Sequence, residues 1–327
     1  MELVFTHMRF KTKYLGFLGV IFFIYLLTKI RFEEILNAIK QIDPLWIIPI
    51  FIFAILTILI NAIRWKYITN KLGIPLSTKD AFSMTLKALF AENSPGKMGE
   101  ILVRATYLKK KTKIGFGKAL FSTTFSRFVD LWVTAMEAVI AVLILVFLFG
   151  LKVSAIIPTL IVLIFIIIAF IVLKKESIIR KLLKPIYKFI IPSSKRENFS
   201  NGFEDFYSGF KNIEVRVIVV SFIYDIIGVG TMALSLYFTG LALGISFPLY
   251  LAILVEPLMT IAVALPISFS GLGAREGVFA YLFSLISLSL EKAFVFSITV
   301  FIVRNILSLT GVILIFFEKK AKIKKSY

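Results

Sequence analysis

The chain has no cysteine and a single histidine, His7, among its 327 residues. The lack of cysteine excludes disulfides, thiolate metal sites and a cysteine nucleophile. One histidine, placed in a basic N-terminal segment, speaks against a histidine-based metal site or a Ser-His triad. The motif Gly-x-x-x-x-Gly-Lys-Ser/Thr, which cradles nucleotide phosphates, is absent as well. We therefore expect neither a metal ion nor another cofactor.

Charged residues are also scarce, at 17%, whereas hydrophobic residues make up 59% and the mean hydropathy is +0.93. These values are well above those of ordinary soluble domains. Several apolar stretches approach or exceed the ~20 residues that a membrane-crossing helix needs. They lie at about 14–30, 44–62, 121–150, 154–173, 215–239 and 293–317. We predict an all-α polytopic membrane protein with six transmembrane helices, forming a single integral membrane domain over residues 1–327.

Two polar, glycine-rich breaks interrupt shorter apolar segments. The first reads Asn93-Ser94-Pro95-Gly96-Lys97-Met98-Gly99-Glu100, and the second reads Leu265-Pro266-Ile267-Ser268-Phe269-Ser270-Gly271-Leu272-Gly273-Ala274-Arg275-Glu276-Gly277. The pieces on either side are too short to span, so we predict re-entrant helical hairpins at about 78–108 and 248–288. Irregular backbone at membrane depth is tolerated only where protein buries it or a wet cavity receives it. Such breaks therefore indicate a substrate site.

Positive charge is distributed unevenly along the chain, which has a net charge of +19. The connection 174–212 carries nine Lys/Arg against four Asp/Glu, and similar excesses flank alternate segments. Positive-inside reasoning then places both termini and this basic connection in the cytoplasm of a cell-membrane protein. The halves 1–150 and 151–327 become an inverted-topology repeat, each with its own hairpin. The excess positive charge indicates anionic lipid surfaces, so we expect no nucleic-acid partner.

The polar residues of the two breaks are the first candidates for substrate binding. Lys97, Arg104 and Arg275 carry the cations that could bind a phosphate through charge-assisted hydrogen bonds. Glu100 and Glu276 could hold those cations in place or bind a substrate ammonium group. The residues that would provide hinges or close backbone approach are Pro95, Gly96, Gly99, Pro266, Gly271, Gly273 and Gly277. In the alternative reading, Arg275 and Glu276 only join their hairpin to a neighbouring helix.

Charged residues inside the predicted spans form the second group of candidates. Each costs ~2.5–3.5 kcal/mol to insert, so a functional role is the default expectation. We expect Arg127 and Arg304 to line the substrate route. Asp130 follows Arg127 at i+3 and could pair with it in a purely structural contact. Glu137, Asp225 and Glu256 are buried carboxylates that either relay cations or accept hydrogen bonds from neighbours.

The first break with the downstream Arg104, and the second break from Pro266 to Gly277, resemble the two signature stretches of the flippase-like family. This family is also called the lysylphosphatidylglycerol synthase transmembrane region. The resemblance covers about residues 10–317. In bacterial synthases of this kind, a similar membrane domain moves aminoacylated phospholipid between leaflets, and a separate soluble domain transfers the aminoacyl group. This chain ends shortly after its last predicted span, so the resemblance implies a stand-alone membrane domain that translocates lipid without synthesising it.

We therefore expect a protein that is not an enzyme and that moves or binds an anionic or zwitterionic phospholipid, glycolipid or polyprenyl-phosphate lipid. Two other classes of function stay open. An intramembrane lipid-modifying enzyme would use Glu100, Glu256 or Glu276 as acid or base. An accessory subunit would bind a membrane glycosyltransferase or another lipid-modifying enzyme, a partnership that some relatives suggest.

Overall fold

The computed structural model describes residues 24–25, 28, 33, 40, 42–93, 98–179, 181, 196–211, 214–264 and 271–324. Most of the first predicted span, 14–30, therefore lies outside the described residues. The same holds for the centres of the two breaks, 94–97 and 265–270, and for much of the basic connection 174–212.

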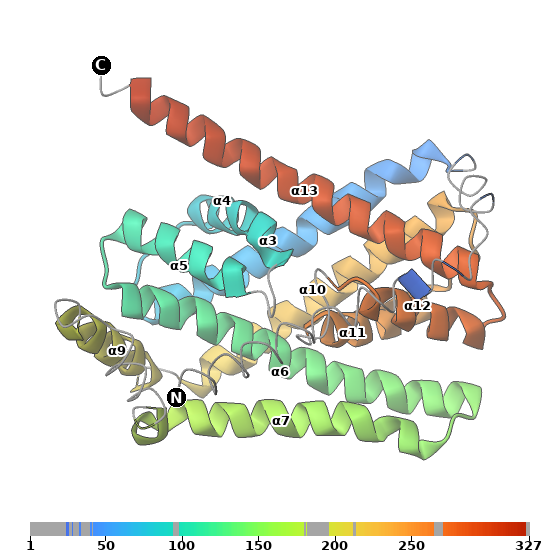
Figure 1. The fold of residues 1–327 in the computed structure, drawn as a ribbon, viewed down its shortest axis with the longest axis horizontal. Helices are drawn as coiled ribbons and strands as arrows, with labels where there is room; N and C mark the ends of the chain where they lie inside the picture. The colour runs from blue at the N-terminus through green and yellow to red at the C-terminus, as the bar shows by residue number, and fades with distance from the viewer. Residues whose placement is uncertain are drawn as a thin grey trace, which may run out of the picture.

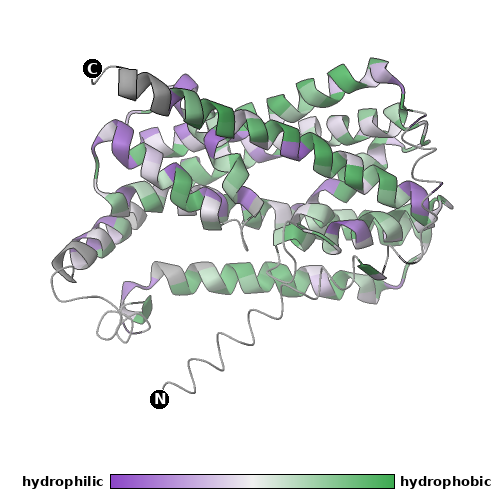
Figure 2. Cartoon of the chain, turned by 45° about the horizontal axis from the view of Figure 1, so that its top comes forward, coloured by the Kyte–Doolittle hydropathy of each residue, from purple (hydrophilic) through white to green (hydrophobic). Residues whose placement is uncertain are grey.

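The described residues form helices and no strands, which confirms an all-helical membrane protein (Figure 1). Four described helices are long and apolar enough to cross a membrane, and these are α3 (Ile47–Lys71), α6 (Phe116–Phe149), α10 (Val215–Ala242) and α13 (Leu290–Lys324). The shorter α7 (Ile157–Lys174) covers the predicted span 154–173. It is hydrophobic along nearly its whole length (Figure 2) and presents exposed isoleucines, as expected of a surface that faces lipid.

The long helices alternate in direction. In Figure 1, α3, α7 and α13 run from right to left, and α6 and α10 run from left to right. The turns at 150–152, 243–248 and 286–289 consequently lie at one end of the bundle. The helix α9 (Arg196–Lys211) and the turn 72–77 lie at the opposite end.

Short helix pairs flank both breaks, where the sequence predicts hairpins. The first pair is α4 (Thr78–Leu89), which continues into the 3₁₀ turn η2 (Phe90–Asn93), and α5 (Met98–Thr112). The second pair is α11 (Leu249–Ala264) and α12 (Ala274–Leu285). The helix α5 runs four residues beyond the predicted hairpin end at 108, because its three consecutive lysines suit the negative pole of a helix C-terminus.

The turns that precede the two pairs are the same in sequence and in hydrogen bonding. Leu72-Gly73-Ile74 follows α3, and Leu243-Gly244-Ile245 follows α10. Both glycines have positive φ, at 75° and 61°. The Ile74 N–H donates to the Thr69 carbonyl at 3.1 Å, and the Ile245 N–H donates to the Gly240 carbonyl at 2.9 Å. In each half of the chain, the long helix that precedes the short helix pair therefore ends with the same glycine-based cap.

The helices α3 and α10 pack antiparallel along most of their length. Trp46 at the start of α3 stacks on Phe238 near the end of α10, with ring centroids 5.6 Å apart. The hydroxyls of Thr57 and Thr231 are 2.9 Å apart halfway along. The two short helix pairs pack in matching ways around this seam. The first helix of each pair packs on the last long helix of the other half, α4 on α13 and α11 on α6. The second helix packs on the last long helix of its own half, α5 on α6 and α12 on α13.

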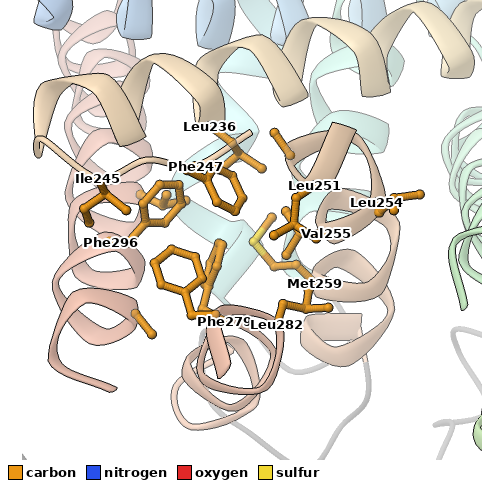
Figure 3. Packing of buried hydrophobic residues seen from close by; sticks show 14 of the residues in the cluster. Leu236, Ile245, Phe247, Leu251, Leu254, Val255, Met259, Phe279, Leu282 and Phe296 are labelled. Atoms are coloured by element: carbon orange, nitrogen blue, oxygen red, sulfur yellow. The ribbon is translucent and has the colours of Figure 1, made fainter. Parts of the chain in front are cut away.

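The largest apolar core belongs to the second half of the chain (Figure 3). Phe247, in the turn before α11, packs its ring against Phe296 of α13 at 4.9 Å and against Phe283 of α12 at 5.3 Å. This core joins α10, α11, α12 and α13 into one body and so fixes the start of α12.

The helix α9 lies within the basic connection, where the sequence analysis predicts no element. It packs on the start of α6, where the rings of Phe206 and Phe121 meet edge to face at 5.3 Å. A Cβ on Gly117 would overlap the Gly202 carbonyl, so glycine permits this close approach.

Candidate functional site

A cavity of about 150 Å³ lies between the two halves of the bundle. It is lined by side chains of α3, α4, η2, α5, α6, α10, α11 and α13. Along α10 the lining extends from Asp225 to Thr239, roughly 20 Å at the rise of an α-helix. A hydrocarbon core is about 30 Å thick, so this stretch of the lining is about two thirds as long as that core.

The cavity wall is strongly charged although apolar helices surround it. Four arginines and five carboxylates line it, namely Arg64, Arg104, Arg127, Arg304, Glu92, Glu100, Asp130, Asp225 and Glu256. Thr57, Thr85, Thr134, Thr260 and Asn61 add neutral polar groups. Buried charges are retained in proteins when they pair with one another. The wall is consequently a polar surface held inside an apolar bundle.

Arg64 of α3 is the hub that connects the two halves. Its side chain is 4% exposed and forms ion pairs with Asp225 of α10 and, at 3.3 Å, with Asp130 of α6. Arg127 also pairs with Asp130. The predicted Arg127–Asp130 contact is therefore confirmed, and it belongs to a larger network across three spans.

Arg104 of α5 faces the same cavity from the first helix pair. Its guanidinium group lies over the Trp65 ring at 4.2 Å, and its Nη1 donates to the Glu100 carboxylate at 3.0 Å. Stacking on an aromatic face and an i,i+4 ion pair both orient an arginine. The sequence-predicted residues Glu100, Arg104 and Arg127 are thus brought together in one wall.

Arg304 of α13 pairs with Glu92 of η2 through both carboxylate oxygens, with Nε donating to Oε2 at 3.0 Å and Nη2 donating to Oε1. Glu92 is buried, whereas the Arg304 side chain is 48% exposed. This bidentate pair ties η2, directly before the first break, to the last span of the second half. On the second helix pair, Glu256 accepts a hydrogen bond from the Thr260 hydroxyl at 3.0 Å.

Arg275 and Glu276 do not line the cavity. Arg275 is 5% exposed, and it donates to the Ser297 hydroxyl at 2.8 Å and to Glu276 at 2.6 Å. The guanidinium group also lies over the Phe301 ring at 4.7 Å. Glu276 accepts the Gly273 N–H at 2.6 Å, so this terminal donor of α12 is already used within the protein. The network joins α12 to α13, as the architectural alternative anticipates, and a headgroup role for Arg275 stays a prediction.

The other predicted residues are placed as follows. Lys97, Pro95, Gly96 and Pro266 lie outside the described residues. Gly271 and Gly273 have positive φ, at 75° and 82°, in the turn before α12, and a hinge role for them stays a prediction. Gly99 lies in the first turn of α5, and Gly277 lies in the first turn of α12.

Two charged residues of the cavity wall were not among the sequence candidates. In the sequence, Arg64 looks like part of the basic flank after 44–62. In the structure, α3 continues to Lys71 and Arg64 is buried. Asp225 in the sequence could have pointed to Arg64, because a carboxylate within a span requires a cationic partner. Glu92 sits one residue before the first break, and only its contact with the distant Arg304 marks it. In the described part of the chain, no group of His, Cys, Asp and Glu side chains could hold a metal ion.

Comparison with known proteins places the chain among integral membrane proteins. The family model described as the lysylphosphatidylglycerol synthase TM region matches residues 13–311. A UPF0104 membrane protein of Methanocaldococcus jannaschii is 30% identical over 122 residues, which cover 37% of this chain and only 36% of that protein. The family match extends from the N-terminal segment through most of α13 and so includes every helix that lines the cavity. The chain belongs to the family of the lysylphosphatidylglycerol synthase transmembrane region.

Proposed function

We propose that this protein translocates a lipid between the leaflets of the cell membrane and that the headgroup passes through the central cavity. The observation that carries the proposal is a charged cavity, walled by both halves of the chain, inside an apolar bundle. A headgroup cannot cross hydrocarbon without leaving its polar partners. A wall with arginines and carboxylates offers the headgroup new polar partners along roughly 20 Å of its path.

The mixed charge of the wall supports a substrate class. Four arginines face five carboxylates, so a headgroup of a single sign would meet repulsion as well as attraction. A zwitterionic headgroup, with a phosphate and a cationic group, finds partners for both. This favours a zwitterionic phospholipid among the lipids that the sequence suggests.

The proposal includes six spans and two re-entrant hairpins in an inverted repeat. Three findings support it: the identical caps after α3 and α10, the antiparallel seam between these helices, and the matched packing of α4 on α13 and α11 on α6. Exposed lysines of the turns support a cytoplasmic location for the end that carries α9. Lys109, Lys110, Lys111, Lys113 and Lys175 are exposed near that end, against Lys152 and Lys292 at the other.

The test is lipid movement in vesicles that contain the purified protein and a fluorescent zwitterionic phospholipid. Gly228 of α10 lines the cavity, and a Cβ there would meet nothing closer than Ile60 at 3.9 Å. Because Gly228 lines the cavity, we expect the Gly228→Leu side chain to narrow it and to slow translocation. Gly230→Leu is the matched control, because Gly230 lies on the same helix, does not line the cavity and would have no atom within 4 Å of an added Cβ.

Vesicles with the parental protein should move lipid faster than protein-free vesicles, and Gly230→Leu should keep that rate. Lipid movement no faster than in protein-free vesicles would refute the proposal. A chemically altered lipid, formed by the purified protein from lipid and a donor, would instead favour the enzymatic alternative. Movement that requires a co-purified glycosyltransferase would favour the accessory role.

A further inference from the structure

Several buried hydrogen-bond donors in one wall of the cavity have no acceptor among the described residues. They are Nε and Nη2 of Arg104, Nε and Nη2 of Arg127, and Oγ of Ser126. All three side chains line the cavity. A buried donor without an acceptor costs free energy, and this cost is larger for a charged group. The concentration of such atoms at one place therefore calls for a physical reason.

The three side chains form one surface. Ser126 and Arg127 are neighbours on α6, and Arg104 lies on α5, which packs against α6. Arg104 and Arg127 both line the cavity, and Arg127 is paired with Asp130. Arg104 is 8% exposed and Ser126 is 1% exposed, so the protein withholds these groups from bulk water.

The existing contacts orient the two guanidinium groups and leave part of each one free. Glu100 binds Arg104 through Nη1 only, and Asp130 binds Arg127 through Nη1 only. Trp65 supports the plane of Arg104 from one side. Each guanidinium group thus retains the adjacent Nε and Nη2 donors, which form the fork that binds two oxygens of one oxyanion.

We propose that Arg104, Arg127 and Ser126 form an oxyanion subsite that binds a phosphate group in the cavity. The inference rests on the proposed function when that phosphate belongs to the translocated lipid. The five donor atoms are buried, and no described residue accepts a hydrogen bond from them. All three side chains line the cavity. When their donors turn toward a phosphate bound there, they form charge-assisted hydrogen bonds in place of unsatisfied ones. Carboxylates elsewhere in the wall, such as Glu256, would lie near the cationic group of a zwitterionic headgroup, away from this subsite.

The test is ligand-dependent thermal stabilisation of the purified full chain in detergent, because a ligand that binds only the folded state raises the melting temperature. The probes are inorganic phosphate, dihexanoyl phosphatidylglycerol, and dihexanoylglycerol, which lacks the phosphate. We expect the phosphate-bearing lipid to stabilise the parental protein and the phosphate-free lipid to have no comparable effect. Stabilisation by inorganic phosphate at similar concentrations would assign the subsite to free phosphate, whereas stabilisation by the lipid alone would assign it to a headgroup.

Arg127→Gln should weaken this binding by about ten- to a hundredfold, as expected for the loss of charge-assisted hydrogen bonds. Asp130 keeps Arg64 as a partner, so the variant retains a cation at that position. Arg127→Lys keeps the charge but not the fork, and it should also weaken binding. Arg216→Gln is the matched control, since Arg216 is an exposed arginine at the start of α10 that does not line the cavity.

Equal stabilisation by the phosphate-bearing and phosphate-free lipids, or unchanged phosphate binding in both Arg127 variants, would overturn the subsite. Its failure is distinguishable from failure of the proposed function. Arg127-dependent phosphate binding without any lipid movement would leave the subsite standing and refute translocation. Lipid movement by the parental protein, together with unchanged phosphate binding in both Arg127 variants, would refute the subsite and leave translocation standing.

Discussion

The replacement of Arg64 by methionine should destabilise the folded protein more than any conservative change at its surface. Arg64 and Asp225 are 4% and 7% exposed, and Asp225 has no other ion-pair partner in the described part of the chain. Removing one member of a buried ion pair costs about 3–5 kcal/mol, because the remaining charge is left uncompensated. Asp130 keeps Arg127, so the cost should come chiefly from Asp225.

The same reasoning predicts rescue. Arg64→Met combined with Asp225→Asn removes the uncompensated charge, so the double variant should be more stable than the sum of the two single losses predicts. Coupling energies for residues in contact are about 0.5–3 kcal/mol. Equilibrium unfolding in mixed micelles, followed by the fluorescence of the three tryptophans, measures all four proteins. Arg216→Met, at an exposed position on α10, is the control and should change stability by no more than about 0.5 kcal/mol. An Arg64→Met variant as stable as this control, or strictly additive losses, would refute the hub role of Arg64.

Three further predictions concern packing, the second break and orientation. Gly311→Val should cost about 1–3 kcal/mol, because a Cβ on Gly311 overlaps the Leu86 carbonyl of α4; Gly230→Val, with open space around it, is the control, and equal melting temperatures would refute this close contact. Arg275→Ala should lower the melting temperature, since it leaves Glu276 buried without its arginine; slower translocation by a variant of unchanged stability would instead establish the predicted headgroup role. Glu204→Cys in α9 should be labelled by an impermeant thiol reagent only from the cytoplasmic side, and Ser289→Cys only from outside. Both positions are exposed and the chain has no other cysteine, so the reverse labelling pattern would refute the orientation.

The sequence predicts the position of the helix pairs well, because proline and glycine interrupt apolar segments at both breaks. It also draws attention to Arg104 through the first break, and to Arg127 and Arg304 because charges within apolar runs are conspicuous. All three line the cavity, and their role in substrate binding stays a prediction. The repeated Leu-Gly-Ile turns at 72–74 and 243–245 were available as a sequence signal of the two halves, but their meaning depends on the positive φ that both glycines adopt.

The remaining features depend on long-range contacts that local patterns do not encode. Arg64 lies in a run that resembles a solvated basic flank, and only packing against Asp225, far along the chain, makes it a buried residue. Arg275 resembles a substrate ligand until Ser297 and Phe301 are placed beside it by α13. The helix α9 has no long apolar run, and its folding depends on the ring contacts and close glycine packing it makes with α6.

The most direct test of a headgroup route through the cavity uses one protein sample before and after chemical modification. Asn61 of α3 lines the cavity, so Asn61→Cys can be modified there with a small charged methanethiosulfonate reagent. We expect modification to stop lipid translocation in vesicles and reduction of the adduct to restore it. The same treatment of Glu204→Cys on α9 should leave the rate unchanged. Fully modified Asn61→Cys protein that moves lipid at its original rate would contradict the route through this cavity.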